Sequence, residues 1–197
     1  MKGDHVIKNI VKTIIGGDIY IDNQLSPSEF IQKYWEIYQK NYKSSQTTNG
    51  GVFEELLAIT LMRKGIFPFY MQAKVSFIPN VNYDFIIYTK NLGPISISSK
   101  TSLRERYKQA DLEAVALKYI HRNAISYLVT LNSQECSRRK SDIGSLMAIN
   151  DIILATSKDF DNILEEIKKN TIKLAPTVKI VTSNTIVTED NYQSRYL

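Results

Sequence analysis

The stretch Asn82–Gln109, NYDFIIYTKNLGPISISSKTSLRERYKQ, decides how the rest of the chain is interpreted. It holds an apolar run that contains a single acid, Asp84, then the turn residues Asn91–Pro94, then a second run that ends on Lys100. Two short apolar runs joined by Asn, Gly and Pro predict a pair of neighbouring strands. The acid and the lysine are therefore expected side by side at adjacent strand ends.

Strand alternation sharpens this expectation. In the run ISISSK, Ser96, Ser98 and Lys100 share one face, which is the face where Asp84 is also expected, and Ser99 falls on the other face. A carboxylate in an apolar strand is costly unless it is paired or bound to a metal. Asp84 and Lys100 could form a structural ion pair. They could instead form a catalytic pair, in which Asp84 binds Mg²⁺ and Lys100 activates water and stabilises charge during phosphodiester hydrolysis.

Composition limits the kinds of protein that fit. A chain of 197 residues suits one domain, and a net charge of +5 with a pI of about 9.1 permits an acidic partner such as nucleic acid. Cys136 is the only cysteine, so a disulfide within the chain and a cysteine-based zinc cluster are excluded. His5 and His121 are the only histidines and lie far apart in the sequence, which disfavours a histidine-based zinc site. Any metal is expected to be a hard ion held by oxygen ligands.

The chain is expected to be cytoplasmic, without a membrane partner. The N-terminus, MKGDHVIKNI, is charged too early for a secretory signal, and no apolar run approaches membrane-spanning length.

The remaining pattern predicts an α/β fold with a mixed central β-sheet flanked by helices. The predicted elements are a short helix or strand within 1–25, a helix from Ser26, a polar and flexible loop at 43–51, a helix at 51–65, a meander of strands at 67–77, 82–89 and 95–100, a helix at 102–122, strands at 125–131 and 151–156, a helix at 160–170, and an edge strand from 179. We expect a single domain, 1–197, divided into three parts: an N-terminal segment at 1–50 for dimerisation or DNA contact, a catalytic core at 51–170, and a C-terminal extension at 171–197.

The helix at 51–65 supplies a third candidate group. Glu54 and Glu55 lie near its start, where an acid often does no more than favour the helix dipole. Either glutamate could instead reach the strand ends and bind metal, and helical spacing does not choose between them.

This ordered set resembles the PD-(D/E)xK nuclease superfamily. The resemblance rests on the Gly-Val-Phe-Glu helix at 51–54, the Asp84 strand and the Ser-Ser-Lys strand end at 98–100, and it spans roughly residues 50–135. The run KTSLRERYKQADLEA at 100–114 is similar to the segment after the catalytic lysine in small type II restriction endonucleases. This resemblance implies a restriction-endonuclease-like core and a Mg²⁺ cofactor.

The resemblance also assigns residues. It implies that Asp84 binds metal, that Lys100 is the catalytic lysine, and that Glu54 is the helix glutamate, with Ser99 as a further metal ligand. Tyr83 stands where the superfamily often has proline. Ser98 stands where a carboxylate is expected two residues before the lysine, so Glu54 is expected to compensate for that acid.

Cationic residues follow the lysine. Arg104, Arg106, Lys108 and Gln109 are expected to contact DNA, with help from a helix N-terminus near Thr101–Ser102. The alternative is an ordinary solvated helix with local ion pairs.

A second basic cluster, Arg138, Arg139 and Lys140, is expected in a loop that follows a buried strand. Loops at strand ends often carry base-reading side chains, although a solvated charge run would look the same. The polar residues Gln46–Asn49 could likewise approach a DNA groove.

The favoured function is a type II restriction endonuclease: Mg²⁺-dependent, sequence-specific hydrolysis of double-stranded DNA that leaves 5′-phosphates, by a homodimer. A repair or junction-resolving nuclease of the same fold is one alternative. A DNA-binding protein that has lost its catalytic centre, with Ser98 as the trace, is the other.

Overall fold

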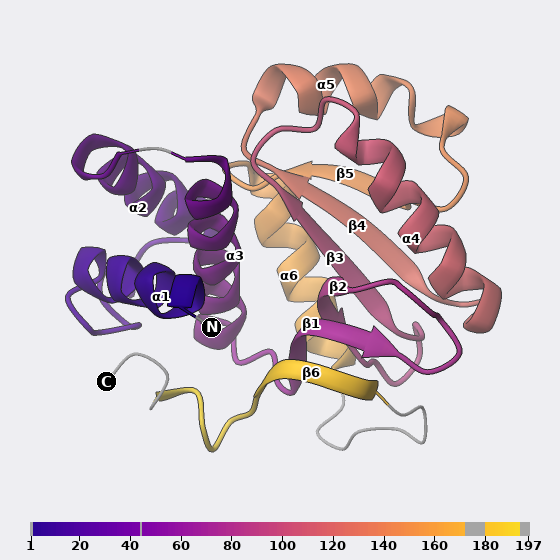
Figure 1. The fold of residues 1–197 in the computed structure, drawn as a ribbon, viewed down its shortest axis with the longest axis horizontal. Helices are drawn as coiled ribbons and strands as arrows, with labels where there is room; N and C mark the ends of the chain where they lie inside the picture. The colour runs from indigo at the N-terminus through magenta and orange to yellow at the C-terminus, as the bar shows by residue number, and fades with distance from the viewer. Residues whose placement is uncertain (1, 44, 172–179, 194–197) are drawn as a thin grey trace.

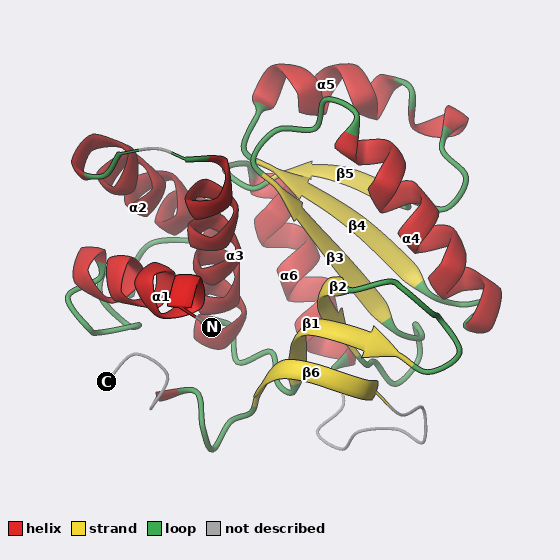
Figure 2. Ribbon diagram, viewed as in Figure 1, coloured by secondary structure: helices red, strands yellow, loops and turns green. Residues whose placement is uncertain are grey.

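A mixed six-stranded sheet forms the centre of the computed structural model, which describes residues 2–43, 45–171 and 180–193. The strands lie in the order β5-β4-β3-β2-β1-β6 (Figures 1 and 2). Their bounds are β1 Phe69–Val75, β2 Tyr83–Ile87, β3 Ile95–Lys100, β4 Ile125–Thr130, β5 Asp151–Leu154 and β6 Ile180–Val187. β1, β2 and β3 form the expected antiparallel meander, β4 and β5 continue parallel to β3, and β6 pairs antiparallel with β1.

Helices cover both faces of the sheet. Their bounds are α1 Lys2–Ile14, α2 Pro27–Asn41, α3 Gln46–Arg63, α4 Arg106–Ile120, α5 Ser133–Ser141 and α6 Lys158–Asn170, with a 3₁₀ turn at Ile143–Ser145. Apolar side chains of α3 and α6 pack against one face, and those of α4 and α5 pack against the other. The predicted α/β architecture, a mixed sheet flanked by helices, is therefore confirmed.

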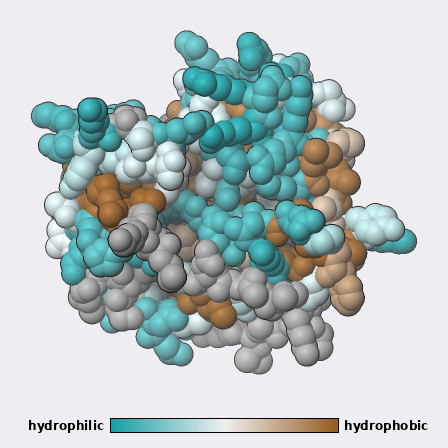
Figure 3. All heavy atoms as spheres, viewed as in Figure 1, coloured by the Kyte–Doolittle hydropathy of each residue, from teal (hydrophilic) through white to brown (hydrophobic). Residues whose placement is uncertain are grey.

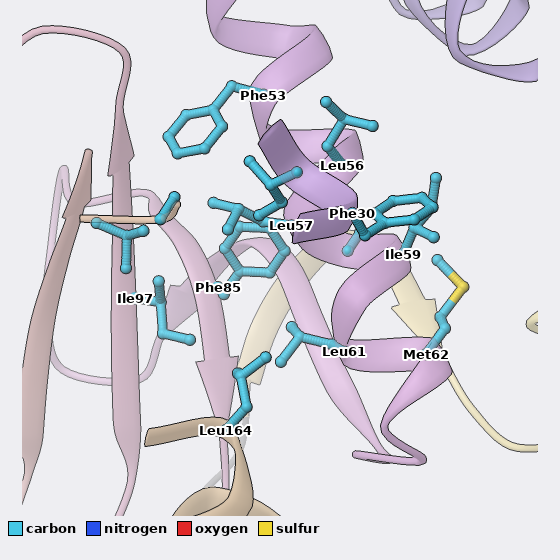
Figure 4. Close-up of a cluster of buried hydrophobic side chains, with 14 of the residues drawn as sticks. Phe30, Phe53, Leu56, Leu57, Ile59, Leu61, Met62, Phe85, Ile97 and Leu164 are labelled. Carbon is cyan, nitrogen blue, oxygen red and sulfur yellow. The ribbon is translucent and has the colours of Figure 1, made fainter. Parts of the chain in front are cut away.

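Helix α3 is buried in the helical layer that covers one face of the sheet. Nearly every side chain from Val52 to Met62 is buried, because α1 and α2 cover the side of α3 that faces away from the sheet (Figures 1 and 4). Phe53 and Leu57 lie against Phe85 and Ile97 of the sheet (Figure 4). A helix held on all sides fixes the place of its one half-buried acid, Glu54, with little freedom.

The predicted loop at 43–51 is wrong for most of its length. α3 begins at Gln46 because Ser45 is its N-cap, with the Ser45 Oγ accepting the N–H of Thr48 at 3.1 Å. The polar residues Gln46–Asn49 are therefore the first turn of a helix, at a fixed position. The other end agrees with prediction, since Gly65 follows α3 at a φ of 67°.

The predicted helix at 102–122 begins later than expected. Residues 101–105 form a loop, in which the Leu103 N–H donates to Glu135 Oε2 at 2.6 Å and Arg104 has a φ of 35°. The helix N-terminus expected near Thr101–Ser102 is thus absent there; α4 starts at Arg106.

The second basic cluster does not lie in a loop. Arg138, Arg139 and Lys140 occupy the last turn of α5, which starts because Asn132 Oδ1 accepts the N–H of Glu135 at 3.0 Å. Basic residues at a helix C-terminus complement the helix dipole, which gives this run a structural reason to exist.

The predicted edge strand is present as β6, although Lys179 itself lies outside the described residues. The segment 1–25 contains the helix α1, not a strand. Among the residues that the structure describes, none forms a helix that is both long and apolar enough to span a bilayer.

Candidate active site

Asp84 of β2 is the centre of a hydrogen-bonded cluster. Its Oδ2 accepts from Lys100 Nζ at 2.9 Å, from the Ser99 N–H at 2.7 Å and from Ser99 Oγ at 3.2 Å. The Asp84 and Lys100 side chains are only 16% and 14% exposed, so the pair is largely removed from solvent. The contact between Asp84 and Lys100 is the one expected from the sequence of Asn82–Gln109.

Strand alternation predicted the partners of Asp84 only in part. Lys100 reaches Asp84 as expected, and so does Ser99, which alternation assigned to the opposite face. Ser98 makes no contact of that kind. Its Oγ is buried without a hydrogen-bond partner among the described residues, beside a small cavity that Asp84 and Glu113 also line.

Glu54 enters the site from α3. Its Oε1 accepts from Gln72 Nε2 at 2.8 Å, and the same nitrogen lies 3.4 Å from Asp84 Oδ1. Burial, reinforced by the negative charge of Asp84, raises the pKa of Glu54 to about 8. Glu55 is buried in the helix at 4% exposure, and of the two glutamates Glu54 is the one that lines the crevice.

These groups open into one crevice of about 380 Å³, which is lined by residues at the start of α3 and at the start of α4. The space-filling view shows hydrophilic side chains along the notch between the α2–α3 side and the α4–α5 side of the molecule (Figure 3). The crevice is lined by Gln46, Thr47, Gly50, Glu54, Asp84, Ser99, Lys100, Arg106 and Gln109.

An adjoining hollow of about 320 Å³ holds the predicted DNA-contacting arginines. It is lined by Gln46, Asn49, Thr101, Ser102, Arg104 and Arg106. Gln46 and Arg106 line both spaces, so the acid–lysine cluster and the arginines face one continuous polar surface.

The other predicted DNA contacts are not brought to this surface. Lys108 pairs with Glu105 at 2.7 Å. Arg139 lies over the Tyr107 ring at 4.1 Å from its centroid, and Lys140 pairs with Asp151 and Asp159 at 3.3 and 3.1 Å. The Arg139 and Lys140 side chains thus make contacts within the protein, and Arg138 lies on the same helix.

Glu113 of α4 is the acid that sequence reasoning missed. Its Oε1 accepts from Gln109 Nε2 at 2.8 Å, and Asp84 and Lys100 both lie near enough to act on its charge. Burial is the main cause that raises the pKa of Glu113. The signal was present: Glu113 stands inside the run at 100–114, one helical turn after Gln109.

The chemistry of these donors fits a hard divalent cation. Asp84 and Glu54 are two carboxylates tied together through one amide nitrogen, beside an open crevice, and Mg²⁺ is commonly held by one or two carboxylates with waters and phosphate oxygens. A cation bound between Asp84 and Glu54 would also offset the repulsion between the two carboxylates. Within the described ranges, no three side chains of His, Cys, Asp or Glu stand close enough to form a complete ligand set.

Comparison with known proteins gives one informative result. A solved structure of the restriction endonuclease PspGI in complex with substrate DNA superposes with a TM-score of 0.58, over 96% of this chain and 85% of the other. The fold is restriction-endonuclease-like. The two sequences are 17% identical, so the likeness concerns the fold. No protein-family model and no curated protein sequence matches the chain.

Proposed function

We propose that this protein is a type II restriction endonuclease: a Mg²⁺-dependent enzyme that hydrolyses double-stranded DNA at a specific sequence and leaves 5′-phosphates. One observation carries the proposal. Lys100 donates to Asp84 inside a crevice that also holds Glu54 and that continues into the hollow lined by Arg104 and Arg106. PspGI, the structural neighbour, is a restriction endonuclease and was solved with its DNA, which supports the same reading.

Each side chain has a role that its position suits. Asp84 and Glu54 would hold Mg²⁺, with Ser99 beside them; the ion, when bound, supplies a Lewis acid and lowers the pKa of water. Lys100 Nζ orients the attacking water and donates to the phosphate oxygen on which charge builds up in the transition state. Arg106 and Gln109, at the rim of the crevice, donate to flanking phosphates.

Glu113 could substitute for the carboxylate that the strand lacks at Ser98. It approaches the cluster from α4, on the side of Asp84 where Ser98 lies, and all three line the same small cavity. We infer that Glu113 supplies the acid that the strand lacks, in addition to Glu54. Two carboxylates beside one lysine, with Glu113 near enough to Asp84 and Lys100 for their charges to act on it, suit catalysis by a metal-dependent nuclease.

Cleavage of both strands at a symmetric site requires two active sites. A homodimer is therefore part of the proposal, with the polar surface of each subunit on one half of the DNA site.

The test is incubation of the protein with plasmid DNA and Mg²⁺, followed by electrophoresis and sequencing of the DNA ends. We expect discrete fragments with 5′-phosphates and a common sequence at every end. Asp84→Asn and Lys100→Met are expected to remove cleavage by at least about a hundredfold, while both variants still bind DNA.

The other outcomes are informative. Nicking that depends on DNA structure and not on sequence would replace this function with a repair or junction-resolving nuclease. DNA binding without any cleavage would indicate a DNA-binding protein in which Ser98 marks a lost centre.

A further inference from the structure

In β1 and β2, the regular alternation of side chains between the two faces of the sheet is interrupted at the active site. Regular alternation would place Phe69, Met71, Ala73 and Val75 on one side of the sheet, yet the first two pack in the cluster against α3 and the last two in the cluster on the opposite face. The change falls at Gln72, between the two pairs.

The neighbouring strand shows the same change at the matching position. Phe85 packs on the α3 side, whereas Tyr83 packs on the opposite side. The pairs Met71↔Phe85 and Ala73↔Tyr83 remain in register, so Asp84 stands across from Gln72. The two side chains at this position, Gln72 and Asp84, thus belong to neither apolar cluster, and Asp84 lines the crevice.

The backbone at Gln72 is strained to achieve this. Its φ is 48°, in the left-handed region that non-glycine residues rarely adopt, and it lies inside a strand paired on both sides. Such strain persists where the surrounding structure imposes it, and it is concentrated at functional sites. Met71 and Ala73, on either side of Gln72, both pair with β2 and with β6, and these pairs hold the backbone that flanks Gln72.

The side chain of Gln72 is oriented at both ends. Asn82 Nδ2 donates to Gln72 Oε1 at 2.6 Å, which fixes the amide so that its nitrogen faces the acids. That nitrogen then donates to Glu54 at 2.8 Å and approaches Asp84 at 3.4 Å. One amide therefore connects an acid of α3 with an acid of β2.

From this geometry we propose that Gln72 is a positioning residue for the divalent metal. Its amide, oriented by Asn82, holds the Glu54 and Asp84 carboxylates at the mutual placement that a metal ion needs. The proposal rests on the function proposed above, and it adds to the site a residue outside the acid–lysine motif. Residues that orient metal ligands commonly affect metal affinity nearly as much as the ligands do.

The test measures Mn²⁺ binding to the DNA-free protein, by the loss of the free-ion electron paramagnetic resonance signal. Gln72→Met keeps the side-chain size without the amide, and we expect about tenfold weaker Mn²⁺ binding. Asn82→Ala leaves the amide but frees its orientation, and a smaller loss in the same direction is expected. Lys74→Met, on the exposed side of the same strand, is the matched control and should bind Mn²⁺ as the wild type does.

A second variant separates positioning from folding. Gln72→Gly removes the amide but suits the positive φ, so its thermal unfolding midpoint should stay near or above that of the wild type. Weaker Mn²⁺ binding in this well-folded variant would support the proposal. In cleavage assays, Gln72→Met and Gln72→Gly should both need more Mg²⁺ to reach half of their maximal rate, with the maximal rate changed less than that requirement.

The outcomes distinguish this inference from the proposed function. Wild-type Mn²⁺ affinity in both Gln72→Met and Gln72→Gly would refute the role of Gln72 and leave the nuclease intact. A wild-type protein that binds Mn²⁺ and cuts no DNA would refute the nuclease, and the order of the Mn²⁺ affinities would still decide the role of Gln72. Absence of Mn²⁺ binding in the DNA-free wild type would refute the role of Gln72, and the cleavage assay would decide the nuclease separately.

Discussion

At the scale of single residues, the acids of the site are not equivalent. Glu54 accepts a hydrogen bond from Gln72, which also approaches Asp84, whereas Glu113 reaches the same cluster from the opposite helix layer and accepts from Gln109. Their separate supports mean that each acid can be removed without displacing the other.

Glu113→Gln tests whether the acid of α4 is needed. The substitution keeps the size of the side chain, so the fold should be unchanged, and we expect cleavage to fall by about ten- to a thousandfold because one negative charge leaves the site. The measurement is the single-turnover rate on a short duplex that carries the cleaved sequence. Glu166→Gln, on an exposed part of α6, is the control. Equal rates for the two variants would leave Glu113 without a catalytic role.

The raised pKa of Glu54 predicts a pH-dependent stability in the metal-free protein. Because burial lifts this pKa to about 8, from an ordinary 4.5, ionised Glu54 opposes folding. Its favourable contribution is complete below about pH 4.5 and is lost as pH rises through 8. Glu54→Gln should therefore be more stable than the wild type at pH 9, by about 1 kcal/mol or more, and similar to it at pH 5.

Thermal unfolding in EDTA at the two pH values measures this difference. Glu165→Gln is the control, because its pairing with Lys64 lowers the pKa of Glu165, and loss of that pair cannot stabilise the protein at high pH. A stability gain of Glu54→Gln that did not depend on pH would contradict the prediction.

At the scale of elements, one buried acid joins α4 to the segment that leads into β5. Asp111 is 4% exposed, and its two oxygens accept the backbone N–H groups of Met147, Ala148 and Ile149 at 2.8, 2.8 and 3.0 Å. Three donors satisfied by one carboxylate fix where α4 lies over the sheet, and α4 carries Glu113.

Asp111→Ala leaves those three backbone donors without their partner. We expect a loss of about 3 kcal/mol or more in the free energy of unfolding, since each buried unsatisfied donor costs about 1–3 kcal/mol. Urea denaturation measures it, with Asp190→Ala at an exposed turn as the control. A loss below about 1 kcal/mol would show that water or other groups replace the carboxylate.

Elements also show how far the sequence could predict this fold. β3 was predicted residue for residue, because Gly93 and Pro94 end the preceding turn and the isoleucines alternate. The start of α3 was missed, since Ser45 lies among other polar residues and its capping bond becomes visible only in three dimensions.

The candidate site was predictable to a similar degree. Asp84, Lys100 and Glu54 could be selected because strand ends and a helix start carry local signals, and the structure brings the three together. From its sequence neighbours, Glu113 looks like an exposed acid on a helix. Its place near the site depends on how α4 packs on the sheet as the connection between the parallel strands β3 and β4. Gln72 carried no signal at all, because a positive φ in the middle of a strand is imposed by its neighbours.

At the scale of the whole molecule, the arginines and lysines expected to contact DNA include two contrasting groups. Arg104 and Arg106 border the polar surface of the crevice, whereas Arg139 and Lys140 of α5 contact Tyr107, Asp151 and Asp159. The net charge of +5 alone does not reveal this division.

DNA binding should follow the division. Arg106→Ala is expected to weaken binding by about tenfold at moderate salt and to reduce the salt dependence by about one phosphate contact. Lys140→Ala, the matched control, should leave both values nearly unchanged. Fluorescence anisotropy of a labelled duplex at several salt concentrations, in Ca²⁺ or EDTA, measures both, and a larger effect from Lys140→Ala would place DNA on the α5 side instead.

The place of β6 in the sheet affects how the chain can be made and shortened. β1 is flanked by β2 and β6, and residues 76–179 separate β1 from β6 along the chain. During synthesis, β1 therefore has one unpaired edge until β6 has left the ribosome. A fragment that stops before Ile180 would keep that edge, with its free N–H and C=O groups beside apolar side chains, and should self-associate into aggregates. Chaperone dependence during expression, and insolubility of C-terminal truncations, are the practical results to expect.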